Sequence, residues 1–401
     1  MEIFSPMENP KLRPLEIIPF LKEGKRHFLL RDRLGIAQEV VLSEKAFLIV
    51  SLFNGENDLR SIQVEFMRRY GELLFSDELE RLVKFLDDCF LLETERFKKK
   101  YQEVLKEWKQ TPIRESAFRG LAYPETENSL REFLWKLLKD QPEDTPSTIR
   151  GIIAPHIDLY RGGSCYGAVY GVLRKLTPPK LVVIFGTSHL PMKDPFAFID
   201  KDFSTPFGLV KTNKEILNQL RRTLPYDPLE ESFLHSKEHT IEFQLLFLQL
   251  LWNGDFEIIP VLCRSFELYL QGKNPEEETE YILTLQLIRD FLQRKEVLVV
   301  ASADLAHIGP QFGDPFLIDY ERLLRLKDQD EEMLSFIERG DSRGFLDYIR
   351  NEGDKRRICG LPPIYATLKV LEPCRGKLID YGQWRDPQGY GSVSFAGMII
   401  S

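Results

Sequence analysis

The 401-residue sequence predicts an α/β fold with a mostly parallel sheet flanked by helices, preceded by a small α+β unit. After residue 113, short apolar segments alternate with longer helical ones, which is typical of a buried parallel sheet. Before residue 106, strand-like segments come first and a run of helical segments follows. We therefore divide the chain into an N-terminal unit at 1–105, a linker at 106–113 and an α/β domain at 114–401.

Composition restricts the class of protein. The chain carries 54 Lys and Arg against 62 Asp and Glu, a net charge of −8, which argues against a general binder of nucleic-acid backbones. No apolar run reaches the ~18 residues of a membrane span, and the segment MEIFSPMENPKLRP does not look like a signal peptide. Five scattered cysteines without a CxxC pair indicate reduced thiols. We expect a cytoplasmic protein without a membrane or nucleic-acid partner.

The N-terminal unit shows two strand candidates and then a series of helices. The first helix follows Ser43, a good N-cap residue, and ends at the turn Asn54-Gly55. A highly charged segment at the end of the unit predicts a solvated linker helix. The expected elements are strands at His27–Asp32 and Glu39–Glu44, helices from Ala46 to Phe53, at 58–70 and at 76–90, and the charged segment Glu95–Gln110.

Two segments of this unit carry a resemblance to a known family. They read VLSEKAFLIVSLFNGENDLRSIQVEFMRRYG and ELERLVKFLDDCFLLE. The order of helix, glycine turn and two further helices resembles the PqqD-like family of small winged-helix domains. That resemblance implies recognition of a peptide or of a radical-SAM enzyme. The alternative is a DNA-binding winged helix, and the basic pair Arg68-Arg69 is too small to favour it.

The α/β domain alternates strands and helices along its length. Its strand candidates are bounded by helical segments of 10–20 residues, and we find no internal repeat. The expected strands are IRGIIAP, KLVVIFG, FEIIPVLC, VLVVASAD and SVSFAGMII, and the expected helices are 164–175, 213–222, 238–252 and 275–294.

Three of these strands lead into polar side chains that can bind a metal. GIIAP is followed by His156 and Asp158, LVVIFGTS by His189, and VLVVASA by Asp304 and His307. Sites in open α/β sheets form beyond the carboxyl ends of the strands. A single histidine in such a place is usually a hydrogen-bonded structural residue. Three strands that are each followed by a histidine at the same edge of the sheet favour a functional site.

Further residues could join this group. His239 and Glu242 are three residues apart in a helical segment, so they share one helix face and could contact a substrate. The alternative for the acidic residues there is stabilisation of a helix N-terminus. Cys359, in RRICGLPPIYA, is either a packed thiol or a ligand on a loop.

Imidazole binds Fe, Cu, Zn and Ni, and a thiolate favours softer ions. Two histidines with one anionic ligand leave coordination positions open for a substrate or dioxygen. Asp304 and His307, three residues apart, fit an acid/base pair beside the metal.

The order of segments in the α/β domain resembles the Memo family, also called protein B of the AmmeMemoRadiSam system. The matching segments cover about 70% of the chain. They are RESAFRGLAYPETENSLREFL, IIAPHIDLYRGGSCYGAVYGVL, VVIFGTSHL, STPFGLVKTN, KEHTIEFQLLFLQ, ASADLAH, ICGLPPI and GSVSFAGM.

This resemblance implies a fold related to the class III extradiol dioxygenases. It implies His156, His189 and Cys359 as metal ligands, with Asp304 and His307 as further site residues. In the dioxygenases the third ligand is a glutamate, so Cys359 puts ring-cleaving chemistry in doubt. Ile157-Asp158 stands where many Memo proteins have Ala-Gly, which adds a carboxylate beside His156.

Three functions follow as hypotheses. The first is a dioxygenase-like oxidoreductase that uses one transition metal, Fe(II) or Cu with Zn as a further option, on a small organic or peptide substrate. Its partners would be a radical-SAM enzyme and an AMMECR-type protein. The second is a metal-containing phosphopeptide-binding or adaptor protein, in which Arg161 could pair with an anion. The third is a cysteine hydrolase with Cys359 as nucleophile and His307 as base.

Overall fold

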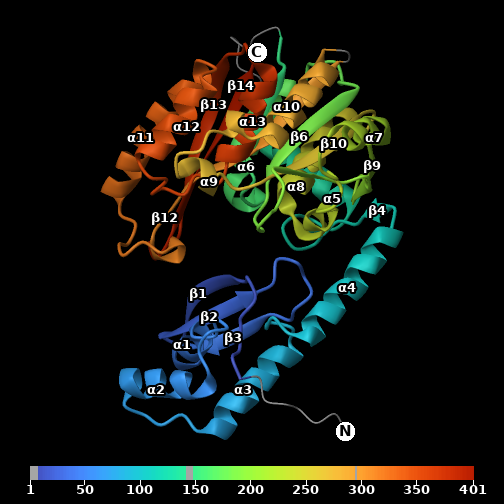
Figure 1. Ribbon diagram of the computed structural model, residues 1–401. Coiled ribbons are helices and arrows are strands. Elements are labelled where there is room, and N and C mark those ends of the chain that lie inside the picture. The colour runs from blue at the N-terminus through green and yellow to red at the C-terminus, as the bar shows by residue number, and fades with distance from the viewer. Residues whose placement is uncertain (1–7, 141–147, 294–295) are drawn as a thin grey trace. The chain divides into compact units, whose positions relative to one another are not determined.

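The computed structural model describes residues 8–140, 148–293 and 296–401 (Figure 1). The chain divides into two compact units, Met1–Thr111 and Pro112–Ser401. Within the segment predicted as a linker, helix α4 (Glu95–Gln110) continues to Gln110, and strand β4 (Ile113–Arg114) begins three residues later.

The N-terminal unit combines a three-stranded antiparallel sheet with helices. The sheet has the order β1-β2-β3. Sequence patterns had located β2 and β3 but not β1, because β1 carries Pro19 and alternates poorly between buried and exposed residues. Proline is tolerated on an edge strand, and β1 lies at the edge of the sheet. The elements are β1 (Glu16–Lys22), β2 (Lys25–Arg31), β3 (Val40–Ser43), α1 (Glu44–Ser51), α2 (Leu59–Tyr70), α3 (Ser76–Asp88) and α4.

Local signals define the helices of this unit, and a core of its own holds them together. The Ser43 side chain accepts a hydrogen bond from the backbone of Ala46, as expected for the N-cap of α1. Asp58 caps α2 in the same way, and Gly71 ends that helix with φ of 67°. The buried core draws on the sheet and on all of α1 to α3; it includes Leu30, Val50, Ile62, Leu79 and Leu86.

The larger unit is built on an 11-stranded sheet. Its central strands, in the order β5-β11-β6-β10-β9, run parallel, and antiparallel strands extend the sheet on both sides. The predicted fold class, a mostly parallel sheet flanked by helices, is confirmed. The parallel strands are β5 (Gly151–Ala154), β6 (Leu181–Thr187), β9 (Gly208–Thr212), β10 (Glu257–Cys263) and β11 (Val297–Ser302). The others are β4, β7 (Phe196–Phe198), β8 (Asp202–Thr205), β12 (Asp304–Ile308), β13 (Gly376–Arg385) and β14 (Ser392–Ile400).

Helices cover both faces of this sheet (Figure 1). One face carries α6 and α8, with α5 packed on them, and the other carries α10 and α13 together with α11 and α12. The elements are α5 (Glu127–Leu137), α6 (Leu159–Leu173), α7 (Lys214–Thr223), α8 (His239–Trp252), α9 (Glu267–Leu270), α10 (Thr279–Leu292), α11 (Tyr320–Glu338), α12 (Ser342–Asn351), α13 (Leu361–Leu371) and the 3-10 turns η1 (Ser232–Lys237), η2 (Pro275–Glu277) and η3 (Pro310–Phe312).

Two differences from the expected elements affect the site. Helix α6 begins at Leu159, five residues before the expected start, because the Asp158 side chain caps it. The segment from Asp304 to Ile308, for which we expected no separate strand, is strand β12. It pairs antiparallel with β14, almost 90 residues later in the chain, and local patterns contain no sign of so distant a pairing.

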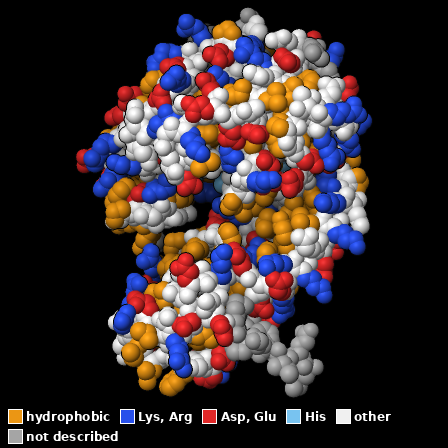
Figure 2. All heavy atoms as spheres, viewed as in Figure 1, with side chains coloured by type: hydrophobic (Ala, Val, Ile, Leu, Met, Phe, Trp, Pro, Cys, Tyr) orange, Lys and Arg blue, Asp and Glu red, His pale blue; other side chains and the backbone are white. Residues whose placement is uncertain are grey.

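The surface is charged, and the helices carry polar as well as apolar side chains. Basic and acidic side chains intermingle over the visible face of the larger unit (Figure 2). Among the described residues, no helix is long and apolar enough to cross a membrane.

We predict that a fragment of residues 1–111 folds by itself, because this unit has its own core. Circular dichroism of the fragment should show helical signal that is lost in one cooperative thermal transition. The fragment should also fail to shift duplex DNA at physiological salt, because its basic pair Arg68-Arg69 is small. A sub-micromolar DNA affinity would overturn that part of the prediction.

Candidate metal centre

The candidate site lies at the carboxyl edge of the parallel sheet. Ala154 of β5 pairs with Ser302 of β11, which in turn pairs with Gly186 of β6. The three strands therefore end at the same level. The residues that follow them, His156, Asp304 and His189, come from one edge of the sheet, as the sequence predicts.

His156 is a buried histidine with a defined tautomer. Its Nδ1 lies 3.1 Å from the backbone carbonyl of Ser302. A carbonyl only accepts, so Nδ1 carries the proton and Nε2 keeps a free lone pair. Asp304 accepts a hydrogen bond of 2.9 Å from the backbone N–H of His156. Burial lowers the pKa of His156 to about 3, against the attraction of Asp304, so the ring is neutral near pH 7.

His189 and His239 share one carboxylate, that of Glu238. The Nδ1 atom of His189 lies 3.0 Å from Glu238 Oε2, and that of His239 lies 3.1 Å from Glu238 Oε1. The same carboxylate accepts hydrogen bonds from the backbone N–H groups of His189, His239 and Thr240. Glu238 is therefore the N-cap of α8 and also orients both imidazoles.

Glu238 is buried and yet ionised. Burial alone would raise its pKa. Electrostatic attraction to His189 and His239 and the hydrogen bonds from their rings outweigh that effect and hold the pKa of Glu238 well below its usual range. The result is a fixed negative charge directly behind two imidazole rings.

The three histidines converge. Each offers one ring nitrogen, and these nitrogens all lie within 4.8 Å of one another. The rings of His189 and His239 stack with centroids 4.9 Å apart, and the His156 ring stands edge-on to both. In all three, Nδ1 lies beside a hydrogen-bond acceptor, so the lone pair that could bind a metal is on Nε2. This donor set fits a transition metal, for which imidazole is the commonest protein ligand.

Cys359 joins the cluster from the loop before α13. Its Sγ lies 3.2 Å from His156 Nε2 and 3.7 Å from the backbone carbonyl of Asp304. The Thr187 hydroxyl, at the end of β6, donates to the carbonyl of Cys359 and ties the loop to the sheet. Burial raises the pKa of the Cys359 thiol well above its usual range, so the metal-free protein holds it protonated.

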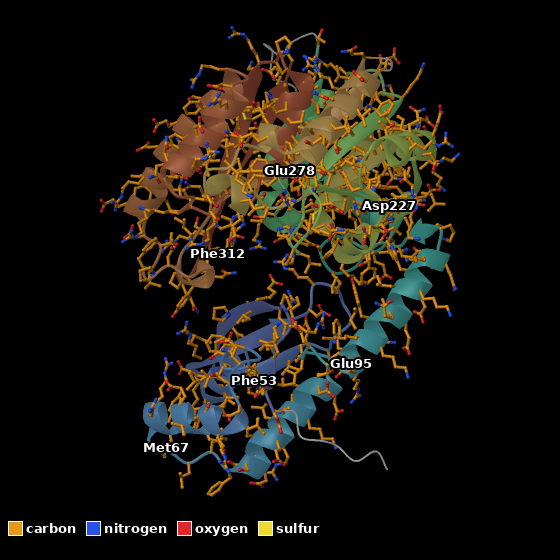
Figure 3. The ribbon with its side chains drawn as sticks, viewed as in Figure 1. Phe53, Met67, Glu95, Asp227, Glu278 and Phe312 are labelled. Atoms are coloured by element: carbon orange, nitrogen blue, oxygen red, sulfur yellow. The ribbon has the colours of Figure 1, made fainter. Side chains whose placement is uncertain are left out.

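His307 lies on β12 beside this cluster rather than within it. Its Nδ1 lies 3.2 Å from the carbonyl of Leu305, which again leaves Nε2 free, and its ring stands edge-on to Phe312 of η3 (labelled in Figure 3). Burial lowers the pKa of His307. Asp304, expected to orient His307, instead bonds the backbone of His156 and lies 3.6 Å from that residue's Nε2.

Comparisons with known proteins identify the family of the α/β unit. A family model described as Memo-like protein matches residues 114–399. The chain belongs to the Memo-like family.

Relatives of this family match the chain over one or both units. A MEMO1 family protein of Aquifex aeolicus is 28% identical over 395 residues, which are 98% of this chain and 100% of that protein. The MEMO1 family protein TTHA0924 of Thermus thermophilus is 31% identical over 80% of this chain and 92% of its own length. The MEMO1 family protein MK0963 of Methanopyrus kandleri is 27% identical over 72% of this chain and 98% of its own length. The Aquifex relative therefore aligns with the N-terminal unit as well as with the Memo-like unit.

Glu242 of the Memo-like unit, expected as a substrate contact, is fully buried in a different environment. Its carboxylate pairs with the buried guanidinium of Arg114 and accepts hydrogen bonds from Tyr123 and from the backbone of Ala117 and Phe118. Arg114 also donates to the backbone carbonyls of His235 and Glu238. These contacts leave Glu242 no free oxygen for a substrate and assign it to the support of α8.

Asp158 and Arg161, the other expected substrate contacts, pair with each other. The Asp158 carboxylate accepts from the backbone of Tyr160 and Arg161 as the N-cap of α6, and from the Arg161 guanidinium. That guanidinium lies over the ring of Trp384, 4.5 Å from its centroid. Both residues have structural partners, and a substrate role for them stays a prediction.

Two features of this site escaped the sequence analysis. Glu238 had been considered only for the helix dipole, and His239 only as a substrate contact. Both roles arise because the N-terminus of α8 meets the end of β6, a contact between distant segments. The available signal was the acidic residue directly before His239 at the start of a helix.

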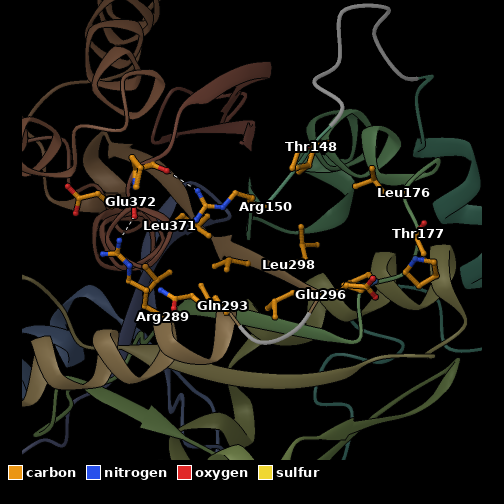
Figure 4. Close-up of a pocket in the computed structure, with 18 of the residues that line it drawn as sticks. Thr148, Arg150, Leu176, Thr177, Arg289, Gln293, Glu296, Leu298, Leu371 and Glu372 are labelled. Atoms are coloured by element: carbon orange, nitrogen blue, oxygen red, sulfur yellow. Dashed lines mark hydrogen bonds between the residues drawn. The ribbon is translucent and has the colours of Figure 1, made fainter.

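A cavity of about 820 Å³ opens at the opposite edge of the sheet (Figure 4). Its lining includes Arg150, before β5, and Glu296, before β11, so it lies at the amino ends of the strands. Arg150 donates to the carbonyl of Pro373, and Arg289 to that of Glu372. This cavity is therefore separate from the histidine cluster.

We predict that Arg114→Met destabilises the Memo-like unit by about 3–5 kcal/mol, because it leaves the buried Glu242 carboxylate without its partner. Urea unfolding followed by circular dichroism measures the change. The matched control is Arg131→Met, which removes an exposed pair with Glu127 worth about 0.3–0.5 kcal/mol. Equal effects of the two substitutions would contradict the structural role given to Arg114.

Proposed function

We propose that the Memo-like unit binds one redox-capable transition metal, Fe(II) or Cu, and works as a metal-dependent oxidoreductase. The observation that carries this proposal is the convergence of three imidazoles, each with Nδ1 held by a buried acceptor and Nε2 free. Histidines that ligate metals in proteins usually show this second hydrogen bond, which fixes the tautomer and raises ligand basicity. A purely structural histidine has no need of a free and converging Nε2.

We assign His156, His189 and Cys359 as ligands and add His239 as a further donor. His156 belongs to both possible ligand sets. It clusters with His189 and His239, and its Nε2 also lies beside the Cys359 thiol. A metal would remove the Cys359 proton, as metals do for coordinating thiols. Fe(II) with three or four protein ligands keeps positions open for a substrate, and a thiolate would also suit Cu.

A bound metal of this kind activates dioxygen or polarises an organic substrate. The protein's own contribution is to place a proton acceptor beside it. His307 is suited to that role, because its lowered pKa keeps it neutral near pH 7 and its Nε2 is free. Asp304 fixes the backbone that carries His156.

A cysteine hydrolase is less well supported. A nucleophilic cysteine needs a lowered pKa and a base that takes its proton. The pKa of Cys359 is raised, and its imidazole neighbour is His156 rather than His307. The radical-SAM enzyme and the AMMECR-type partner remain part of the proposal, and co-purification from the native host tests them.

We predict that the purified protein carries close to one transition metal per chain, and that His189→Ala loses most of it. Element analysis of anaerobically purified protein measures both. His27→Ala, in the N-terminal unit, is the control and should keep the metal of the parent. If the His189→Ala protein binds metal as tightly as the parent, the ligand assignment is wrong.

We predict that Glu238→Gln weakens metal binding about 10- to 100-fold, because a neutral amide cannot hold both imidazoles as a carboxylate does. Competition with a chelator of known affinity measures the change. Glu257→Gln, an acidic residue at the start of β10, is the control. A metal affinity unchanged by Glu238→Gln would remove the orienting role of this carboxylate.

We predict that metal binding protects Cys359 from alkylation, while the other four cysteines react alike with and without metal. Cys359→Ser should weaken Cu(I) more than Fe(II), because a hydroxyl is a poor ligand for a soft ion. Mass spectrometry of the alkylated protein and metal titration of the variant measure these effects. If the alkylation of Cys359 does not change with metal, and Cys359→Ser binds Cu(I) and Fe(II) like the parent, the three histidines are the whole ligand set.

A further inference from the structure

A second cavity, of about 420 Å³, lies between β12 and α11, which are neighbouring elements in Figure 1. Its walls come from one face of α11, the end of β12, the segment after η3 and the loop before α13. The lining residues are Ile308, Asp314, Phe316, Arg322, Arg325, Leu326, Gln329, Lys355, Arg356 and Arg357. Half of these ten residues are arginine or lysine and one is acidic, in a chain of net charge −8.

Two of the five cations are structural. The Arg356 guanidinium is buried and pairs with Asp330 and Glu352. Arg357 forms two hydrogen bonds with Asp314, of 2.8 and 3.2 Å. These pairs build the wall of the cavity, and their charges are balanced within the protein.

The other three cations are available. Lys355 is exposed and has no ion-pair partner among the described residues. Arg325 pairs with Glu321 at 3.2 Å, but both side chains are exposed, so the pair contributes little. The Nε atom of Arg322 is buried without a hydrogen bond among the described residues, and Asp319 Oδ2 lies 3.7 Å from it. A buried N–H without an acceptor favours an anionic ligand.

Apolar side chains complete the cavity. Ile308, Phe316 and Leu326 line it, and the Arg322 guanidinium lies over the Phe316 ring, 4.1 Å from its centroid. A free inorganic ion would leave this apolar surface uncovered. We propose that the cavity binds a small organic anion, with a phosphate or carboxylate held by Arg322, Arg325 and Lys355 and an apolar body against Phe316. Its volume lies in the range of small-molecule sites.

This site is distinct from the histidine cluster. Ile308 and His307 are consecutive on β12, and successive side chains of a strand point to opposite faces. The anion would therefore sit on the other side of β12 from the His307 ring. The two sites are joined by backbone contacts, because His307 N–H donates to the carbonyl of Arg356 at 2.6 Å and Arg357 donates to the carbonyl of His307.

The loop that supplies Lys355 is held in an unusual conformation. Asp354 and Arg357 both adopt left-handed backbone, with φ of 47° and 54°, a region that favours glycine. This conformation turns three consecutive cations, Lys355 to Arg357, towards one cavity. The loop then continues to Cys359, so an occupant of the cavity contacts the segment that carries the proposed thiol ligand.

Isothermal titration of the full-length protein with phenyl phosphate, benzoate and inorganic phosphate tests the proposal. We expect one site per chain, with phenyl phosphate bound at least about tenfold more tightly than inorganic phosphate, because the apolar lining covers the ring. The double variant Arg322→Gln/Lys355→Gln should bind phenyl phosphate at least about tenfold more weakly. Lys327→Gln, a cation of α11 outside the cavity, is the control and should bind like the parent.

Several outcomes would overturn the proposal. They are absence of saturable binding by all three probes, or equal losses in the double variant and in Lys327→Gln. If the double variant has a lower thermal midpoint than the parent, Arg325→Gln, an exposed change on α11, replaces it with the same expected loss. An unchanged affinity in that variant would equally overturn the assignment.

Discussion

The histidine cluster depends on one buried carboxylate, that of Glu238. It accepts hydrogen bonds from the backbone of three residues and from the rings of His189 and His239. One side chain thus caps α8, anchors the end of β6 and fixes the tautomers of two donors. A carboxylate can do all of this because its two oxygens accept hydrogen bonds from several directions and it donates none when ionised. Together with the hydrogen bond from the Thr240 hydroxyl to the Thr187 carbonyl, it joins the start of the helix to the end of the strand.

The support continues one layer deeper, through Arg114 and Glu242. Arg114 comes from the first strand of the Memo-like unit, and Glu242 lies one helical turn after Glu238 on α8. The fully buried ion pair between them, with the bonds from Arg114 to the carbonyls of His235 and Glu238, holds the first turn of α8 in place. Buried pairs of this kind add little net stability, but removing one partner is costly. Here the pair serves to fix the position of the first turn of α8.

The sequence was sufficient for features that depend on local pattern. Buried apolar runs followed by His156, His189 and Asp304 predicted both the parallel sheet and the edge at which the site lies. The Memo-like resemblance, now confirmed, added Cys359, which no local pattern singles out. Features that depend on pairing between distant segments were missed or misassigned. Glu242 was expected in the cleft because it shares a helix face with His239, yet that face also meets Arg114, 128 residues away. Strand β12 exists only because β14 pairs with it.

The charges around the histidine cluster support the proposal that a cation binds there. The buried Glu238 carboxylate is kept ionised by its attraction to His189 and His239 and by the hydrogen bonds from their rings, although burial opposes it. A cation held by the converging nitrogens of His156, His189 and His239 would lie close to this negative charge and would be attracted by it. Burial already keeps the His156 ring neutral, so no proton would have to leave it before a cation could bind. The same carboxylate that orders the rings would thus also favour the cation proposed to bind between them.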